Sequence, residues 1–154
     1  MRVALLNTQV PLVSGGAERH AARLAEALRA HGHEAVEVTL PFKWYPGATL
    51  ARSILAAKLL DVSEAAGVPI DLAIGLRFPA WLMHHPNKTF WIIHQYRQAY
   101  DLWESGDSEL LDDPEGAALR QTILSEDRAA LGAGAPLFAN SRNVAARLDR
   151  ALGL

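Results

Sequence analysis

The order of apolar patterns in the first forty residues constrains the fold more than any other feature of the sequence. Residues 3–6 form a short, wholly apolar run, as is typical of a parallel strand that is buried on both faces. An apolar stripe at spacings of three and four residues then runs along residues 17–28 and indicates an amphipathic helix. Residues 33–40 alternate apolar and polar side chains and stop at Pro41, so we predict a second strand and a complete βαβ unit.

The rest of the chain continues this alternation of strands and helices. The expected elements are a helix over 50–62, strands over 71–75 and 90–93, a helix from Pro114 to Gly132, a strand over 137–139 and a last helix capped by Ser141. Strands that alternate with helices form a mainly parallel sheet with helices on both faces. We therefore predict one doubly wound, Rossmann-like α/β domain over residues 1–154.

Composition narrows the partners and the cellular location that we expect. The formal net charge of −2 gives no general attraction to nucleic acid, and the absence of cysteine leaves no disulfide or thiolate metal site. The first residues lack the pattern of a secretory signal, and the longest apolar run is far below the roughly 18 residues of a membrane span. We expect a cytoplasmic protein, in which exposed side chains provide the remaining route to a peripheral membrane association.

The loop after the first predicted strand is the first candidate for a ligand site. Ligands of open α/β sheets bind beyond the carboxyl ends of the strands, and Ser14, Gly15 and Gly16 lie there, just before a helix. Adjacent glycines let the backbone approach a phosphate closely, and the free amides at a helix start favour negative charge. A turn with a purely conformational role explains the pair equally well, so the pair requires context.

That context excludes two common classes of nucleotide-binding protein. The sequence has no Gly-x-Gly-x-x-Gly motif, and the second predicted strand ends in Thr39-Leu40-Pro41 where a dinucleotide oxidoreductase carries an acidic residue for the ribose. The loop also lacks the Gly-Lys-Ser or Gly-Lys-Thr sequence of phosphate-binding NTPases. Neither a dinucleotide oxidoreductase nor an ATPase of this type is expected.

Several segments resemble one known family in both order and spacing. They are MRVALLN at 1–7, GGAERH at 15–20, LAEAL at 24–28, GHEAV at 32–36, His94 after the fourth predicted strand, and ANSRNVAARL at 139–148. Together they resemble the N-terminal domain of retaining glycosyltransferases of the GT-B fold, of the family-4 type. The resemblance covers nearly the whole chain.

The resemblance implies a division of labour between two Rossmann-like domains that face a cleft. The N-terminal domain binds mostly the acceptor, and the C-terminal domain, which carries the family's paired glutamates, binds mostly the nucleotide sugar. This sequence corresponds to the N-terminal domain, so we expect a piece of a larger enzyme that is inactive without its C-terminal domain. The expected reaction moves a sugar from a nucleotide-diphosphate sugar to a sugar, lipid or small-molecule acceptor with retained configuration, with no metal or other cofactor.

The resemblance also assigns roles to individual residues. Gly15 and Gly16 correspond to backbone positions that contact the donor diphosphate. His94 corresponds to a catalytic-site residue that positions a hydroxyl of the acceptor or of the donor sugar, and a general-base role is less expected because retention in this family involves front-face attack. Without the resemblance, His94 would be interpreted as a histidine at the edge of the core that bonds to backbone.

Further residues are candidates for contact with the acceptor. They are Arg19 and His20 in the first helical turn, Trp44 and Tyr45 beside Phe42 in an aromatic loop, and Arg97 and Tyr100 beside Asp101 and Trp103 in the loop after His94. Solvated helix residues and rings that pack a loop on the sheet are the alternatives. His84 and His85 are adjacent and so face different directions, which predicts surface residues and no metal site.

Two other functions stay open at the level of sequence. One is a non-catalytic α/β module that binds a phosphorylated ligand or a partner protein through the same cleft. The other is an isomerase related to sugar-nucleotide epimerases, which ranks lower because its site would also be divided between two domains. The sugar, the nucleotide base and the acceptor are not determined by the sequence.

Overall fold

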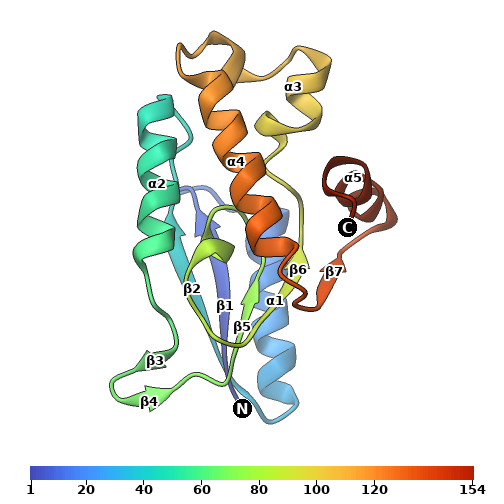
Figure 1. Cartoon of the computed structure of the whole chain (residues 1–154). Helices are drawn as coiled ribbons and strands as arrows, with labels where there is room; N and C mark the ends of the chain where they lie inside the picture. The colour runs from blue at the N-terminus through green and yellow to red at the C-terminus, as the bar shows by residue number, and fades with distance from the viewer.

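Five parallel strands form the main sheet in the order β2-β1-β5-β6-β7 (Figure 1). The computed structural model describes residues 1–154. The strands are β1 (Arg2–Gln9), β2 (Glu34–Pro41), β5 (Leu72–Gly75), β6 (Lys88–Ile92) and β7 (Leu137–Ala139). The chain runs from β1 to β2 in one direction and then returns to β5 on the other side of β1. This reversal places a topological switch point between β1 and β5, where open α/β sheets bind ligands.

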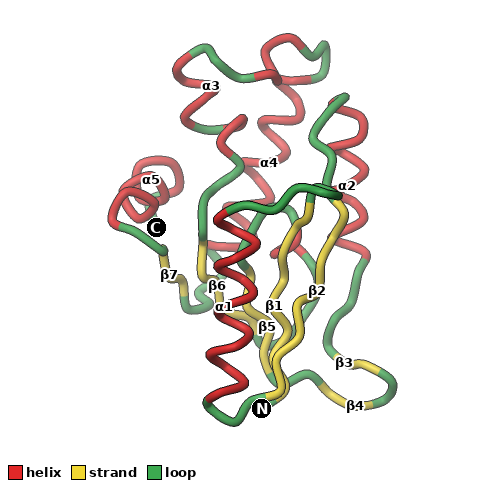
Figure 2. Tube along the Cα trace, turned by 180° about the vertical axis from the view of Figure 1, so that it is seen from behind, coloured by secondary structure: helices red, strands yellow, loops and turns green.

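Helices cover the sheet on both faces. Helix α1 (Gly16–Ala30) lies on one face, and α2 (Gly47–Leu59) and α4 (Gly116–Leu131) lie on the other, as the two opposite views in Figures 1 and 2 show. Helix α5 (Arg142–Leu152) follows β7 at the edge of the sheet. The short elements are β3 (Glu64–Ala65), β4 (Val68–Pro69), η1 (Ala80–Leu82), η2 (Arg97–Ala99), α3 (Asp101–Ser105) and η3 (Glu109–Asp112).

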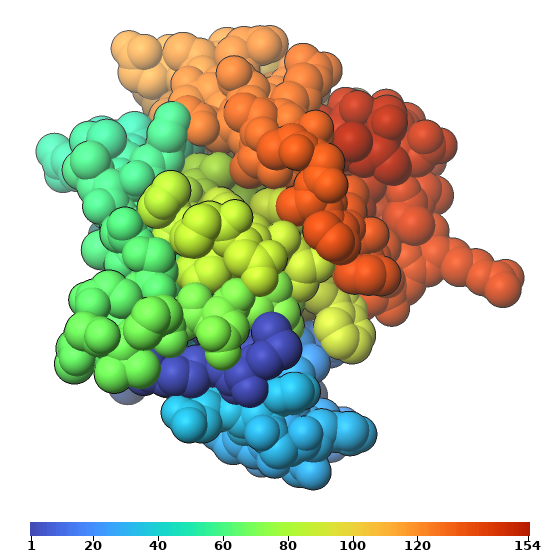
Figure 3. Space-filling model, turned by 60° about the horizontal axis from the view of Figure 1, so that its bottom comes forward, coloured from blue at the N-terminus to red at the C-terminus, as the bar shows by residue number.

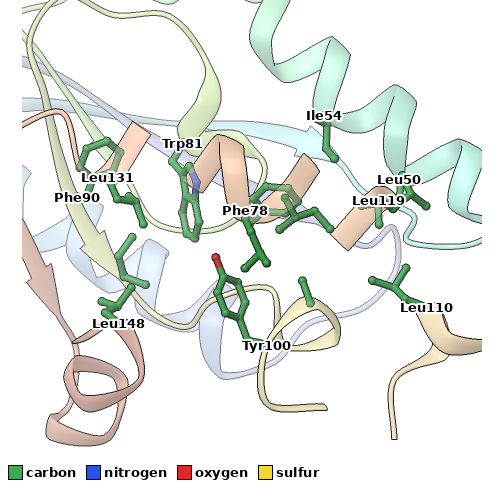
Figure 4. Packing of buried hydrophobic residues seen from close by; sticks show 14 of the residues in the cluster. Leu50, Ile54, Phe78, Trp81, Phe90, Tyr100, Leu110, Leu119, Leu131 and Leu148 are labelled. Atoms are coloured by element: carbon green, nitrogen blue, oxygen red, sulfur yellow. The ribbon is translucent and has the colours of Figure 1, made fainter. Parts of the chain in front are cut away.

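Alternation along β1 divides its side chains between two hydrophobic clusters. Val3 and Leu5 pack with α1, whereas Ala4 and Leu6 pack with residues of α2 and η1 on the opposite face. A third and larger cluster lies under α2 and α4 and includes the fully buried Trp81 (Figure 4). The apolar run at the start of the sequence is therefore a strand covered on both faces, as its composition predicts.

Polar contacts of Arg2 fasten the amino end of the sheet. The Arg2 backbone N–H donates to Asp71 Oδ2 at 2.6 Å, and its guanidinium donates to Val68 O at 2.8 Å and lies 3.4 Å from Glu34 Oε2. Figure 3 shows this end of the molecule, where the start of β1 lies between the β3-β4 segment and the segment that joins α1 to β2. The candidate site described below lies at the opposite end of the strands.

The structure confirms an α/β fold with a mainly parallel sheet, as in Rossmann-like domains, and corrects several element boundaries. Helix α2 begins at Gly47 and ends at Leu59, earlier than the predicted 50–62, because the backbone turns to an extended conformation at Leu60. Pro114 does not occupy the first position of a helix. The η3 turn comes first and α4 begins only at Gly116.

His85 is buried, which corrects the prediction that both members of the His84-His85 pair lie at the surface. Only 4% of His85 is exposed; its Nε2 donates to Ile70 O at 3.0 Å and its Nδ1 accepts from the Asn87 N–H at 3.0 Å. His84 is exposed. No group of three or more His, Cys, Asp or Glu side chains is arranged to hold a metal ion, and no helix has the length and apolar character needed to cross a membrane.

Candidate functional site

A cavity of about 210 Å³ lies beyond the carboxyl ends of the strands, near the switch point between β1 and β5. Its polar lining consists of Arg77, His94, Arg97 and Gln98, and its apolar lining of Val10, Phe42, Trp44, Phe78, Tyr96 and Leu102. These side chains come from the loops that follow β1, β2, β5 and β6 and from α3. Residues that are far apart in sequence therefore meet because the parallel strands end at one edge of the sheet.

The glycine-marked loop presents one amide that is already bonded and one that is free. The Gly15 N–H donates to Glu18 Oε2 at 2.8 Å, whereas nothing in the chain accepts a hydrogen bond from the Gly16 N–H. Gly15 is extended, with φ −141° and ψ −156°, and a Cβ added at Gly16 would meet no atom within 4 Å. Neither glycine has a left-handed backbone. A Cβ at Gly15 would lie only 3.3 Å from Glu18 Oε2, whereas Gly16 has open space around it and an amide with no partner in the chain.

Arg77 joins this loop to the two strands at the switch point. Its guanidinium lies 2.6 Å from Glu18 Oε1 and donates to Thr8 O at 3.2 Å. Burial raises the pKa of Glu18, but the bonds from its own N–H, the Gly15 N–H and Arg77 outweigh burial and hold that pKa below its usual value. The sequence reasoning missed Arg77, although its place just after a strand at the carboxyl edge was a usable signal.

His94 is held as a neutral imidazole in the wall of the cavity. Its Nδ1 lies 2.8 Å from Gln95 O, and because a carbonyl only accepts, Nδ1 carries the hydrogen and Nε2 carries the lone pair. Burial lowers the pKa of His94 below 6.5, and the nearby Arg77 and Arg97 lower it further against the Gln95 bond. No group in the chain bonds to Nε2, which leaves it free to accept a hydrogen bond from a hydroxyl.

Aromatic side chains form the apolar wall of the cavity. The rings of Phe78 and Tyr96 lie 5.6 Å apart at 33°, and Phe42 meets Tyr96 edge-on at 6.0 Å. The Trp44 Nε1–H donates to Glu109 Oε2 at 2.7 Å and so fastens the loop after β2 to η3. Behind this link the Tyr96 hydroxyl is buried without a partner, and burial together with Glu109 raises its pKa.

The two residues of the aromatic loop that were predicted to contact the acceptor lie in different places. Trp44 and Phe42 line the cavity, but Tyr45 is 54% exposed and does not. The Tyr45 ring instead packs edge-on against Trp44 at 5.2 Å and lies 4.8 Å from Lys43 Nζ. Arg97 lines the cavity while its guanidinium is paired with Asp101, at 2.8 Å from Oδ2.

Tyr100, which was predicted to contact the acceptor, is a core residue and does not line the cavity. It is 5% exposed, and its hydroxyl donates to the buried Asp127 Oδ2 at 2.7 Å. Figure 4 shows the ring of Tyr100 within the hydrophobic cluster, with the hydroxyl directed into it. Trp103, which also follows His94, stacks with Arg120 at 5.1 Å and does not line the cavity.

Arg19 and His20 lie in a separate groove along α1. This groove has a volume of about 630 Å³ and is also lined by Gly16, Arg23 and Trp91. The His20 ring packs edge-on against Trp91 at 5.4 Å, and Arg19 and Arg23 form no ion pair within the chain. The structure therefore brings His94, Trp44 and Arg97 together but places Arg19 and His20 elsewhere.

Comparisons with protein-family models, with curated proteins and with solved structures gave no match for this chain. A proposal for the function therefore rests on three observations: the sheet topology, the geometry of the cavity and the resemblance of the sequence segments.

Proposed function

We propose that this chain is the acceptor-side domain of a retaining glycosyltransferase of the GT-B type, which uses a nucleotide-diphosphate sugar as donor. The observation that carries the proposal is the free, neutral Nε2 of His94 in a cavity at the switch point. The Gly16 amide at the start of α1 and the Arg77 guanidinium, which is paired with Glu18 of the same helix, offer a diphosphate a hydrogen-bond donor and a positive charge.

The reaction balances as a substitution at the anomeric carbon of the donor sugar. The acceptor hydroxyl oxygen bonds to that carbon, and the bond from the carbon to the diphosphate oxygen breaks with its electron pair staying on the diphosphate. The proton of the attacking hydroxyl leaves with the diphosphate. In this scheme His94 accepts a hydrogen bond from a substrate hydroxyl and fixes its position, and such positioning is worth up to about a hundredfold in rate.

A second, donor-binding domain is part of the proposal. Because the family's diphosphate-binding basic residues and paired glutamates belong to that domain, residues 1–154 alone should transfer no sugar. If residues 1–154 alone transferred sugar at a rate comparable to that of the two-domain enzyme, the two-domain proposal would be wrong. The cavity is nevertheless complete within this chain, so binding of an acceptor can be measured without the second domain.

The test uses the protein encoded by the complete reading frame. It is screened by thermal shift against a panel of nucleotide sugars, since a ligand that binds the folded state raises the apparent stability. A hit is then used in a transfer assay, with the product's anomeric configuration read by NMR. We expect retention, and we expect His94→Ala to lower kcat by roughly tenfold to a hundredfold while the matched His84→Ala variant, at an exposed histidine outside the cavity, leaves it unchanged.

The screen also separates this proposal from a non-catalytic module. Binding of free phosphorylated compounds without sugar transfer from any nucleotide sugar would favour the module. Unchanged kinetics in the His94→Ala variant would show that His94 has a structural role and no role in the reaction.

A further inference from the structure

The wall of the cavity beside His94 is apolar and mostly aromatic. Phe78 and Tyr96 present neighbouring rings, and Leu102 closes the wall on the side of α3. An aromatic ligand gains from such a wall twice, because it removes apolar surface from water and makes favourable ring-to-ring contacts.

Both guanidinium groups of the cavity are ion-paired within the chain, and the side-chain oxygen of Gln98 accepts a backbone hydrogen bond. The Arg97 Nε–H donates to Asp101 Oδ2 at 2.9 Å, Arg77 is taken up by Glu18 and the Thr8 carbonyl, and Gln98 Oε1 accepts from the Glu109 N–H at 2.8 Å. A free sugar presents hydroxyls around its whole ring, and each one that is buried without a partner costs free energy. His94 Nε2 is a side-chain acceptor of the cavity that has no partner in the chain, and it suits a ligand hydroxyl.

The size and charge of the cavity narrow the ligand further. Its volume of about 210 Å³ exceeds the roughly 150 Å³ of an apolar cavity that holds benzene, so one ring or two fused rings fit. Arg77 and Arg97 are close enough to act on the charge of His94, and their positive potential disfavours an ammonium group but suits a phenolic oxygen.

We propose that the acceptor is a small, neutral aromatic alcohol, with its ring against Phe78 and Tyr96 and its hydroxyl donating to His94 Nε2. The word acceptor rests on the proposed glycosyltransferase function. The binding itself does not, because it involves only residues of this chain.

The test measures binding of three probes to the 154-residue chain by isothermal titration calorimetry. The probes are 2-naphthol, 2-methoxynaphthalene, which has the same rings but no hydroxyl to donate, and glucose. We expect 2-naphthol to bind most tightly, at least tenfold more tightly than glucose. Its advantage over 2-methoxynaphthalene should be about two- to tenfold, the value of one net hydrogen bond.

Two variants locate the binding. His94→Ala should remove the advantage of 2-naphthol over 2-methoxynaphthalene and leave the latter's Kd unchanged, whereas the exposed control His84→Ala should preserve both values. Leu102→Glu, on the half-buried side of the wall, should weaken both naphthalene probes. Circular dichroism checks that each variant is folded.

Three results would overturn the proposal: tighter binding of glucose than of the naphthalenes, an equal Kd for 2-naphthol in wild type and His94→Ala, or no binding of either naphthalene. Its failure is distinct from failure of the proposed function. If 2-naphthol binds as expected but no nucleotide sugar supports transfer, the proposed ligand class is supported and the proposed transferase function is wrong. If the protein transfers a sugar to free sugars but does not bind 2-naphthol, the transferase function is supported and the proposed ligand class is wrong.

Discussion

The charge state of His94 depends mainly on groups from two segments of the chain, the loop after β5 and the loop after β6. Burial and the positive charges of Arg77 and Arg97 lower its pKa below 6.5, while the Gln95 carbonyl fixes which ring nitrogen carries the hydrogen. A histidine with a pKa below 6.5 is mostly neutral at pH 7 and becomes charged only as the pH falls through that pKa. The Nε2 lone pair is thus available over the whole neutral range.

This argument predicts the titration of His94 and its response to Arg77. An NMR titration of the His94 ring should give a midpoint below 6.5, and Arg77→Met should raise it, because a nearby positive charge is removed and Glu18 is left unpaired beside the ring. The resonance is assigned from the spectrum of His94→Gln. A wild-type midpoint at or above 6.5, or a lower midpoint in Arg77→Met, would contradict the description of the site.

Sequence reasoning found His94 but not Arg77, and the physical reason is the distance of their partners along the chain. His94 follows a recognisable apolar strand, and its bond to Gln95 is local. Arg77 acquires its role from Glu18, 59 residues away, and only the crossing from β2 to β5 brings the two together. The buried position of Tyr100 was not predicted for the same reason, since its partner Asp127 lies far along the chain on α4.

Asp127 connects three elements through one buried carboxyl group. On α4, it accepts from Trp81 Nε1 of η1 at 3.1 Å and from the hydroxyl of Tyr100, just before α3, at 2.7 Å. Burial raises its pKa to about 7, against the effect of these two bonds. The folded chain therefore keeps the Asp127 proton to a higher pH than the unfolded chain, in which the pKa is 3.8.

The contribution of Asp127 to the free energy of unfolding should accordingly fall as the pH rises from near 4 to about 7 and stay level above that value. The contribution of Asp127 over this window is up to about 4 kcal/mol, from roughly three pKa units at about 1.4 kcal/mol each. Asp127→Asn keeps the shape of the side chain: its Oδ1 can accept from Trp81 Nε1, as Asp127 Oδ1 does, and its Nδ2 can donate to the Tyr100 hydroxyl oxygen. The difference between variant and wild type therefore isolates the titration of this group. Urea unfolding from pH 4.5 to 8 measures it, and a difference that does not grow in favour of Asn with pH would refute the assignment.

Ser141 was recognisable as a helix cap from sequence alone, and the structure confirms it. Its Oγ accepts from the Val144 N–H at 3.2 Å at the start of α5. Caps are local, and so they are among the features that sequence shows best. Ser141→Ala should lower the free energy of unfolding by about 1 kcal/mol. Ser141→Asp should keep most of the stability that the cap provides, because Asp is also a good N-cap residue. Equal stability of the Ala variant and the wild type would show that α5 does not depend on this bond.

At the scale of the whole molecule, the parallel order of the strands followed from periodicity and the fine boundaries did not. The apolar runs of β1 and β5 and the stripe of α1 are intrinsic to the local sequence. The starts of α2 and α4 are instead set by tertiary contacts. Asp113 accepts from the Gly47 N–H at 2.8 Å, and this bond between distant segments fixes both helix starts.

The Glu18–Arg77 pair joins α1 to the loop after β5 and so ties together the two halves of the sheet that separate at the switch point. Their side chains are only 17% and 16% exposed, which shields the pair from solvent and salt. Breaking it from either side leaves a charge partly buried without its partner.

A double-mutant cycle with Glu18→Gln and Arg77→Met should therefore give a coupling energy of about 1 to 3 kcal/mol in urea unfolding. The exposed pair Arg2–Glu34, with Glu34 82% exposed, serves as the comparison and should give less than about 1 kcal/mol. Raising the salt concentration from 0.05 to 0.5 M, about tenfold, should weaken the Arg2–Glu34 coupling more than the Glu18–Arg77 coupling. If the two pairs couple equally, the Glu18–Arg77 contact is an ordinary surface ion pair, and the halves of the sheet are held together by the β1-β5 hydrogen bonds and the apolar clusters alone.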